Sequence, residues 1–198
     1  MGNLLTRRRE LILASGALPE WDYEWDASKG LLNQNGNGFQ YEAVGSGGYA
    51  CSIVNDYLQF RGSSSNYKRY NYPTTYTTGV MEAEIYVTSN AVMIIQFSDG
   101  EHYIGAGLRS SSSYQGIYLG TGTTTKIVSA SASTKYKVRL VLKSGLLGDV
   151  YVNDVLQEED VDLTDYSGSV IRITGRGSGS GNVYSRLYSL KMKFNRTE

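Results

Sequence analysis

The sequence predicts an all-β protein, a two-sheet antiparallel β-sandwich preceded by a short N-terminal α-helix. The chain of 198 residues contains 17 Tyr and 23 Gly but only 2 Pro. Tyrosine favours strands because its ring packs on a pleated surface while its hydroxyl stays in water. Glycine supplies the positive φ that tight turns need. Hydrophobic residues make up 40% of the chain, which is enough for the core of one domain of this length.

The helix is predicted over residues 1–18, "MGNLLTRRRELILASGAL". Two apolar pairs recur at seven residues, Leu4 with Leu11 and Leu5 with Ile12, and a glycine and a proline then end the pattern. The segment is not read as a signal peptide, because its apolar run "LILA" is far shorter than the ~7–15 residues of a signal. Two roles remain open: a cap packed on the domain, or a helix for docking or homo-oligomerisation.

Residues 19–34 are expected to connect this helix to a sandwich of residues 35–198. The segment contains Trp21 and Trp25 in "EWDYEWD", with acidic residues between them and a proline nearby. This composition indicates an extended segment. We expect the tryptophans to anchor the connection rather than to stack on a ligand.

About a dozen strand-like runs follow, separated by turn signals such as "GSGG", "ND" and "GSSSN". This regular spacing is typical of a β-sandwich. The runs are 39–44, 49–54, 57–62, 67–72, 79–87, 91–98, 102–109, 115–120, 126–130, 135–143, 149–159, 168–175 and 182–194.

Charge and composition exclude several functions. Nineteen basic residues balance nineteen acidic ones, so no net field draws the chain to nucleic acid or to an anionic membrane. Cys51 is the single cysteine and His102 the single histidine, which excludes both an intrachain disulfide and a Cys/His zinc cluster. No stretch is long and apolar enough to span a bilayer. A cytoplasmic or virion-associated location is therefore expected.

The run "VMEAEIYV" places Glu82 and Glu84 one residue apart. Side chains alternate along a strand, so both glutamates share the wet face. The run "KYKVRLVLK" (135–143) carries basic residues on its own wet face, and cross-strand ion pairs worth ~0.2–1 kcal/mol each would follow. A catalytic pair would need a cleft between carboxylates ~5–9.5 Å apart, with one pKa raised by burial. No cleft is indicated, so ion pairing is the preferred interpretation.

Three segments resemble the concanavalin A-like lectin/glucanase superfamily, including its laminin-G-like domains. They are "YTTGVMEAEIYVTSNAVMIIQFSDG", "KYKVRLVLKSGLLGDVYVNDVLQ" and the last strand "RLYSLKMKF". The resemblance covers roughly residues 35–195, and its most specific part is the hairpin, with Asn153-Asp154 at the turn. It implies a jelly roll whose concave sheet often carries a carbohydrate site. The acidic triad of the glucanases is absent, because "GEHYIGAGLR" offers only Glu101 at the corresponding place.

The resemblance implies a sugar-binding face on the strands around residues 96–118. Sugar recognition uses aromatic platforms and convergent polar groups. The candidate ligand-binding residues are Gln96, His102, Tyr103, Arg109, Tyr114 and Tyr118. Relatives often bind Ca²⁺ through clustered oxygen ligands, but no dense cluster is evident near Asp99, so neither a metal site nor a cofactor is predicted.

Three functions are compatible with these features. The preferred one is a non-catalytic carbohydrate-binding or adhesion module whose partner is a glycan. The alternative is a structural or assembly protein, associated with a phage or prophage tail, because a helix precedes a lectin-like sandwich and "LLTRRREL" resembles the openings of such proteins. A diverged glycoside hydrolase or lyase ranks third. The glycan, its metal dependence and the oligomeric state are not determined by the sequence.

Overall fold

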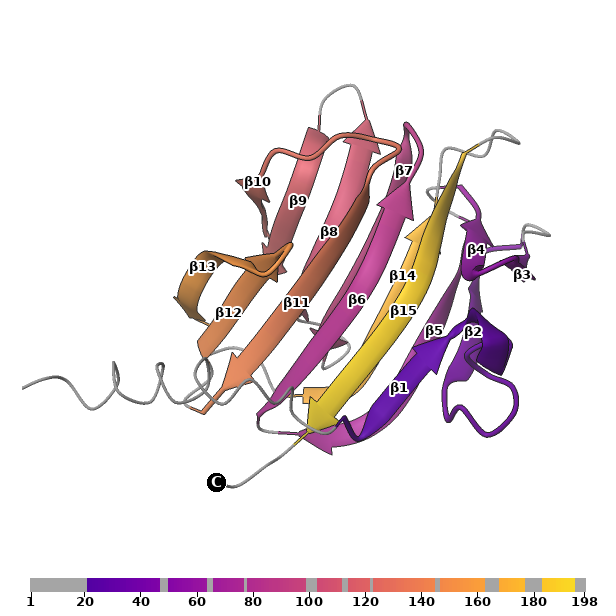
Figure 1. Ribbon diagram of the computed structural model, residues 1–198, viewed down its shortest axis with the longest axis horizontal. Coiled ribbons are helices and arrows are strands. Elements are labelled where there is room, and N and C mark those ends of the chain that lie inside the picture. Colours follow the sequence, from indigo (N-terminus) through magenta and orange to yellow (C-terminus); the bar gives the residue numbers. More distant parts are fainter. Residues whose placement is uncertain are drawn as a thin grey trace, which may run out of the picture.

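The computed structural model describes residues 21–46, 50–63, 66–76, 78–98, 103–111, 114–121, 123–144, 147–162, 168–176 and 183–194. These residues form two antiparallel sheets, A and B, layered face to face, with β15 of sheet A lying in front of β14 of sheet B in Figure 1. The predicted β-sandwich is confirmed. The helix predicted over residues 1–18 lies outside the described residues. Within them, no helix has the length and apolarity to cross a membrane.

Sheet A has the strand order β13-β12-β11-β6-β15-β4-β3, and β1 also pairs with β15. Its strands are β1 (Tyr23–Asp26), β3 (Cys51–Val54), β4 (Tyr57–Arg61), β6 (Gly79–Val87), β11 (Lys135–Lys143), β12 (Leu147–Val152), β13 (Val155–Asp162) and β15 (Tyr184–Phe194).

Sheet B has the strand order β10-β9-β8-β7-β14-β5-β2. Its strands are β2 (Gln40–Val44), β5 (Tyr67–Tyr76), β7 (Ala91–Ser98), β8 (Tyr103–Ser111), β9 (Tyr114–Thr121), β10 (Thr123–Val128) and β14 (Gly168–Arg176).

The run 149–159 spans two strands, β12 and β13, joined by the turn that the resemblance implied. Asn153 and Asp154 form its turn with φ values of 50° and 65°. Two positive φ angles are what a two-residue type I′ turn requires, and Asn and Asp tolerate them well. The Asn153 side chain accepts a hydrogen bond from the backbone N–H of Lys137 at 3.0 Å, which fixes the hairpin to β11.

The core lies between the sheets and follows from side-chain alternation. Met81, Ala83, Ile85 and Val87 on β6 are fully buried. Sheet B contributes the fully buried side chains Met93, Ile95, Ile171 and Ile173. Burial of one such side chain stabilises the fold by about 1.5–3 kcal/mol, so this layer dominates the stability.

Strand β1 was not predicted, because "YEWD" is too short for a pattern. It pairs with β15 and buries Trp25 to 2% exposure. The Trp25 indole N–H donates to the Gly30 carbonyl at 3.0 Å, just after the 3₁₀ helix η1 (Ala27–Lys29). Trp25 is therefore part of the core, while its role in anchoring the preceding segment stays a prediction.

A β-bulge lies between Leu187 and Ser189 in β15. Two residues rather than one separate the buried Leu187 from the buried Leu190, so the extra residue keeps both leucines on the core face. The edge of β15 opposite β6 also changes partner here. It pairs with β4 over residues 184–187 and with β1 over residues 189–192.

The two sheets approach each other closely at Gly175 of β14. A Cβ atom at this position would lie 2.3 Å from Phe60 Cγ and 2.5 Å from Ser185 Oγ, both in sheet A. No carbon atom fits at these distances unless β4 or β15 shifts. Glycine is therefore required here by close approach rather than by its backbone angles.

We expect Gly175→Ala to lower the free energy of unfolding by about 1–3 kcal/mol, the usual cost of overpacking a core. Urea denaturation followed by circular dichroism would measure the change. Ser52→Ala, at an exposed position on β3, is the control, with an expected effect within about 0.5 kcal/mol. Equal stabilities of Gly175→Ala and the control would contradict the close packing inferred at this point.

Candidate functional site

The predicted ion pairs of Glu82 and Glu84 are confirmed on the outer face of sheet A. Glu82 Oε2 lies 3.4 Å from Lys137 Nζ and 3.8 Å from Arg139 Nη1. Glu84 Oε2 lies 3.6 Å from Lys135 Nζ. Each carboxylate thus faces the basic row of β11, as the alternation predicted. The two glutamates form the wet face of a strand.

The same face of sheet A carries tyrosines gathered around Arg186. The guanidinium carbon of Arg186 lies 4.2, 4.7 and 4.8 Å from the ring centroids of Tyr57, Tyr86 and Tyr184. Arg186 also donates to the hydroxyls of Tyr184 at 3.0 Å and Tyr188 at 3.2 Å. These cation–π contacts occupy faces that a sugar ring would otherwise use for stacking.

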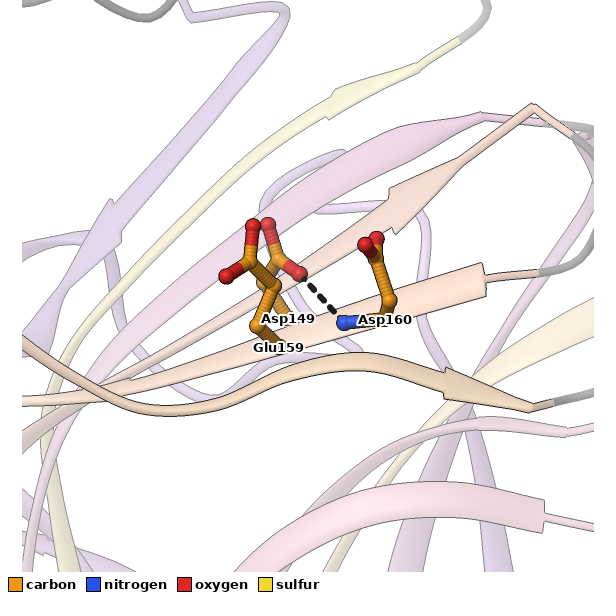
Figure 2. A group of neighbouring side chains, drawn as sticks. All are labelled: Asp149, Glu159 and Asp160. Atoms are coloured by element: carbon orange, nitrogen blue, oxygen red, sulfur yellow. Dashed lines mark hydrogen bonds between the residues drawn. The ribbon is translucent and has the colours of Figure 1, made fainter. Parts of the chain in front are cut away.

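Three carboxylates gather on β12 and β13, where oxygens of Asp149, Glu159 and Asp160 lie within 4.8 Å of one another (Figure 2). A bulge causes this crowding, because Glu159 and Asp160 together lie opposite Asp149. The backbone N–H of Asp160, whose φ is 52°, donates to Asp149 Oδ1 at 3.0 Å.

Two of the three carboxylates in this cluster are bound by a lysine. Lys143 Nζ donates to Asp149 Oδ1 at 2.7 Å and also to Asp160. Burial opposes the charged form of Lys143, but these two hydrogen bonds prevail and raise its pKa. The ammonium therefore bridges Asp149 and Asp160.

A row of polar side chains crosses the outer face of sheet B from β2 over β5 to β14. Arg69 donates to the Glu42 carboxylate through Nε at 2.5 Å and through a second nitrogen. The Asn71 amide donates to Glu42 Oε2 at 2.7 Å and accepts from Arg172 Nε at 2.8 Å. We call these four residues the polar row. Their order follows from the sheet register, since Glu42 pairs with Arg69 and Asn71 pairs with Arg172.

Electrostatics differ along the polar row. Hydrogen bonds from Arg69 and Asn71 outweigh desolvation and hold the pKa of Glu42 below its usual value. At the other end, burial and then the nearby Arg69 charge lower the pKa of Arg172. The carboxylate is therefore well compensated, and the positive charge of Arg172 is only weakly compensated.

Beyond Arg172 the outer face continues across β7, β8 and β9. Gln96 pairs with Arg172 on one side and with Gly105 on the other. Gly107 pairs with Tyr118. Gln96 and Tyr118 alternate with the fully buried Ile95 and Ile117, so they point away from the core, yet they are only 6% and 7% exposed. Glycine positions between them leave the middle of this face without side chains on β8.

The predicted site residues fall on neighbouring strands of sheet B. Gln96 on β7 and Tyr118 on β9 lie on its outer face, and the register places Gln96 beside Arg172. The positions Tyr103 and Arg109 are in β8 and Tyr114 is in β9, but their side chains lie outside the described part. His102 lies outside the described residues. These six assignments remain predictions.

The polar row was not predicted from the sequence, although a signal for it was present. In "YKRYNY" the buried Tyr70 alternates with Arg69 and Asn71, and in "VIRITG" Arg172 lies between two fully buried isoleucines. Alternation alone therefore places these polar residues on the outer face. Their contact with Glu42 depends on pairing between strands far apart in the chain and could not be read locally.

We expect the contribution of Glu42 to stability to depend on pH. Its lowered pKa means that the contribution is present above the unfolded value of 4.5 and is lost as the pH falls through the folded value. At about pH 7 the Glu42→Gln variant should be less stable than the native chain by at most ~1 kcal/mol, since the pair is partly solvated. This gap should close on acidification. A stability difference between the native chain and Glu42→Gln that grows as the pH falls would contradict a lowered pKa of Glu42.

We expect Lys143→Gln to lower the free energy of unfolding by about 2 kcal/mol, because the buried Asp149 loses its cation and three carboxylates repel. Lys135→Gln is the matched control. Its ion pair with Glu84 is exposed on both sides, and its loss should cost less than about 1 kcal/mol. Chemical denaturation at low and high salt would compare the two. Equal effects of the two substitutions would show that the cluster needs no internal cation.

No family model and no curated protein sequence matches the chain. Among solved structures it is similar to the potassium-bound carbohydrate recognition domain of Emp46p, at TM-score 0.61 and 10% identity over 87% of this chain and 98% of that one. The cellulose induced protein Cip1 gives TM-score 0.61 and 12% identity, covering 89% and 99%.

The carbohydrate binding module CBM66 from Bacillus subtilis gives TM-score 0.55 and 13% identity, covering 77% and 94%. Identities this low establish the fold alone. Together with the order of strands in the two sheets, these similarities show that the chain has the concanavalin A-like lectin jelly-roll fold.

Proposed function

We propose that this chain is a non-catalytic carbohydrate-binding or adhesion module whose ligand lies on the outer face of sheet B. The observation that carries the proposal is the polar row of Glu42, Arg69, Asn71 and Arg172. Its side chains are fixed by hydrogen bonds to one another. Sugar hydroxyls require donors and acceptors held in a fixed geometry, and a network built on paired strands supplies them. Two of the structures with this fold are described as carbohydrate-recognition or carbohydrate-binding domains.

Sheet B is preferred to sheet A because the terminal N–H donors of Arg172 on its outer face have no hydrogen-bond acceptor among the described residues. On sheet A the tyrosine faces are used by Arg186, and the glutamates of β6 are used by the basic row of β11. On sheet B, Gln96 lies next to the polar row. Tyr118 and the positions Tyr103, Arg109, Tyr114 and His102 are further candidates for contacts along the same strands.

The proposal of a non-catalytic role rests on the carboxylates. Glycoside hydrolysis commonly needs two of them flanking the scissile bond. Among the described side chains of sheet B, Glu42 is the only carboxylate, and Arg69 and Asn71 bind it. A carboxylate with a lowered pKa is also a poor general acid near neutral pH. These features favour binding over cleavage.

A glycan-array screen of the purified chain, run with calcium and with chelator, tests the proposal. We expect reproducible binding to at least one class of glycan, and we expect it to persist in chelator because the polar row, which lies on the other sheet from the carboxylate cluster, binds through its own side chains. Asn71→Ala should lower the affinity for the captured glycan by about tenfold. The substitution removes the side chain that links Glu42 to Arg172 and orients both. Tyr151→Ala on sheet A is the control and should bind as the native chain does.

A blank array in both conditions, with folded protein, would overturn the carbohydrate-binding proposal. Binding that survives Asn71→Ala but is lost with Tyr151→Ala would assign the glycan to sheet A instead. Loss of binding under chelator would contradict the metal-independent site argued here.

A further inference from the structure

We propose that the ligand of sheet B is an acidic glycan, and that Arg172 binds a carboxylate of its sugar. This inference rests on the proposed carbohydrate-binding function and specifies its substrate class. It is carried by the charge and the hydrogen-bond geometry of the polar row, and by the contrast with the opposite face of the sandwich.

The polar row contains two guanidinium groups and one carboxylate. Arg69 takes both oxygens of Glu42, one of them through Nε at 2.5 Å. Asn71 takes a further lone pair of Glu42 Oε2 at 2.7 Å. The only negative charge of the row is thus already used by Arg69. One positive charge remains, and it belongs to Arg172.

Among the described residues, Arg172 has a hydrogen-bond partner at one edge. Its Nε donates to Asn71 Oδ1 at 2.8 Å, a neutral acceptor that is itself oriented by Glu42. Among the described residues, neither terminal nitrogen of Arg172 has a hydrogen-bond acceptor. The planar end of the guanidinium therefore keeps two N–H donors whose spacing suits a carboxylate bound bidentately.

The surroundings of Arg172 fit the rest of a sugar. Gln96 and Asn71 flank it in the register on either side, and Thr174 is the next outward position of β14. Amide and hydroxyl groups donate and accept, as vicinal sugar hydroxyls require. Gln96 and Thr174 are each only 6% exposed, so the local dielectric is low and strengthens a charged contact. A carboxylate at Arg172 would meet few competing water molecules.

On the outer face of sheet A, the basic residues of β11 are paired with acidic residues of the same chain. There Lys135, Lys137 and Arg139 each lie within 4.0 Å of a glutamate oxygen. Arg186 is enclosed by tyrosine rings and donates to two tyrosine hydroxyls. Arg186 thus differs from Arg172, whose terminal nitrogens have no hydrogen-bond acceptor among the described residues.

Isothermal titration calorimetry of the full chain tests the inference with paired probes that differ only in charge. One pair is trigalacturonate and its methyl ester, and the other is 3′-sialyllactose and lactose. The two pairs separate a hexuronate from a sialate as the source of the carboxylate. We expect at least one acid to bind about tenfold tighter than its neutral partner, since a hydrogen bond to a charged group contributes ~1.5–3 kcal/mol. This preference should weaken with added salt.

Substitutions test whether Arg172 carries the preference. Arg172→Gln should lower the affinity for the acidic sugar by about tenfold and change the affinity for the neutral partner by less than about twofold. Arg172→Lys keeps the charge but loses the paired N–H donors of the guanidinium. Its affinity for the acidic sugar should lie between those of the native chain and Arg172→Gln. Glu42→Gln removes the competing carboxylate and should raise the affinity for the acidic sugar about two- to threefold. A purely structural role of Glu42 would not produce this gain. Arg139→Gln on sheet A is the matched control, and each variant is checked by thermal unfolding.

The outcomes are distinguishable. Equal affinity for the acid and its neutral partner would overturn the acidic preference and leave the carbohydrate-binding function standing. Parallel loss of both sugars in Arg172→Gln, in a folded variant, would assign Arg172 a structural role and would also overturn the inference. Failure of every glycan, acidic or neutral, would remove the proposed function itself.

Discussion

The apolar layer between the two sheets is the constraint on which the rest of the molecule depends. Because side chains alternate along a strand, each residue that enters this layer sends its two neighbours to the outer surface. Burial of Ile171 and Ile173 therefore fixes where Arg172 points, and burial of Met81, Ala83 and Ile85 does the same for Glu82 and Glu84. The chemistry of both outer faces is thus set by the packing inside, and the close contact of Gly175 with Phe60 fixes how the sheets meet.

The outer faces of the two sheets carry similar residues but differ in how those residues are paired. On sheet A, opposite charges lie directly across β6 and β11, and the cation of Arg186 is enclosed by rings. On sheet B, Arg69 and Asn71 both donate to the Glu42 carboxylate, and Arg172 donates through Nε to Asn71. The two faces therefore differ in how their cations are paired.

The sequence was most informative where a strand is long and half-buried. Residues 79–87 and 135–143 alternate so regularly that both their limits and their ion pairs were predicted. Strand β1 escaped prediction because four residues carry too little pattern. Local pattern joined 149–159 into a single run, whereas the resemblance placed the turn at Asn153-Asp154. The polar row was beyond local reasoning, since Arg172 and Asn71 are 101 residues apart and meet only because β14 pairs with β5.

The shared edge of β15 has a consequence for the integrity of the fold. Beyond the bulge, β1 supplies the hydrogen-bonding partner of residues 189–192 and fills the adjacent space with Trp25. The segment therefore acts as a complementing strand, joined to the sandwich by four residue pairs and one indole ring. If it were released, β15 would present an open, partly apolar edge of the kind that recruits strands from other molecules. The first described strand of the chain thus protects its last strand from association with other chains.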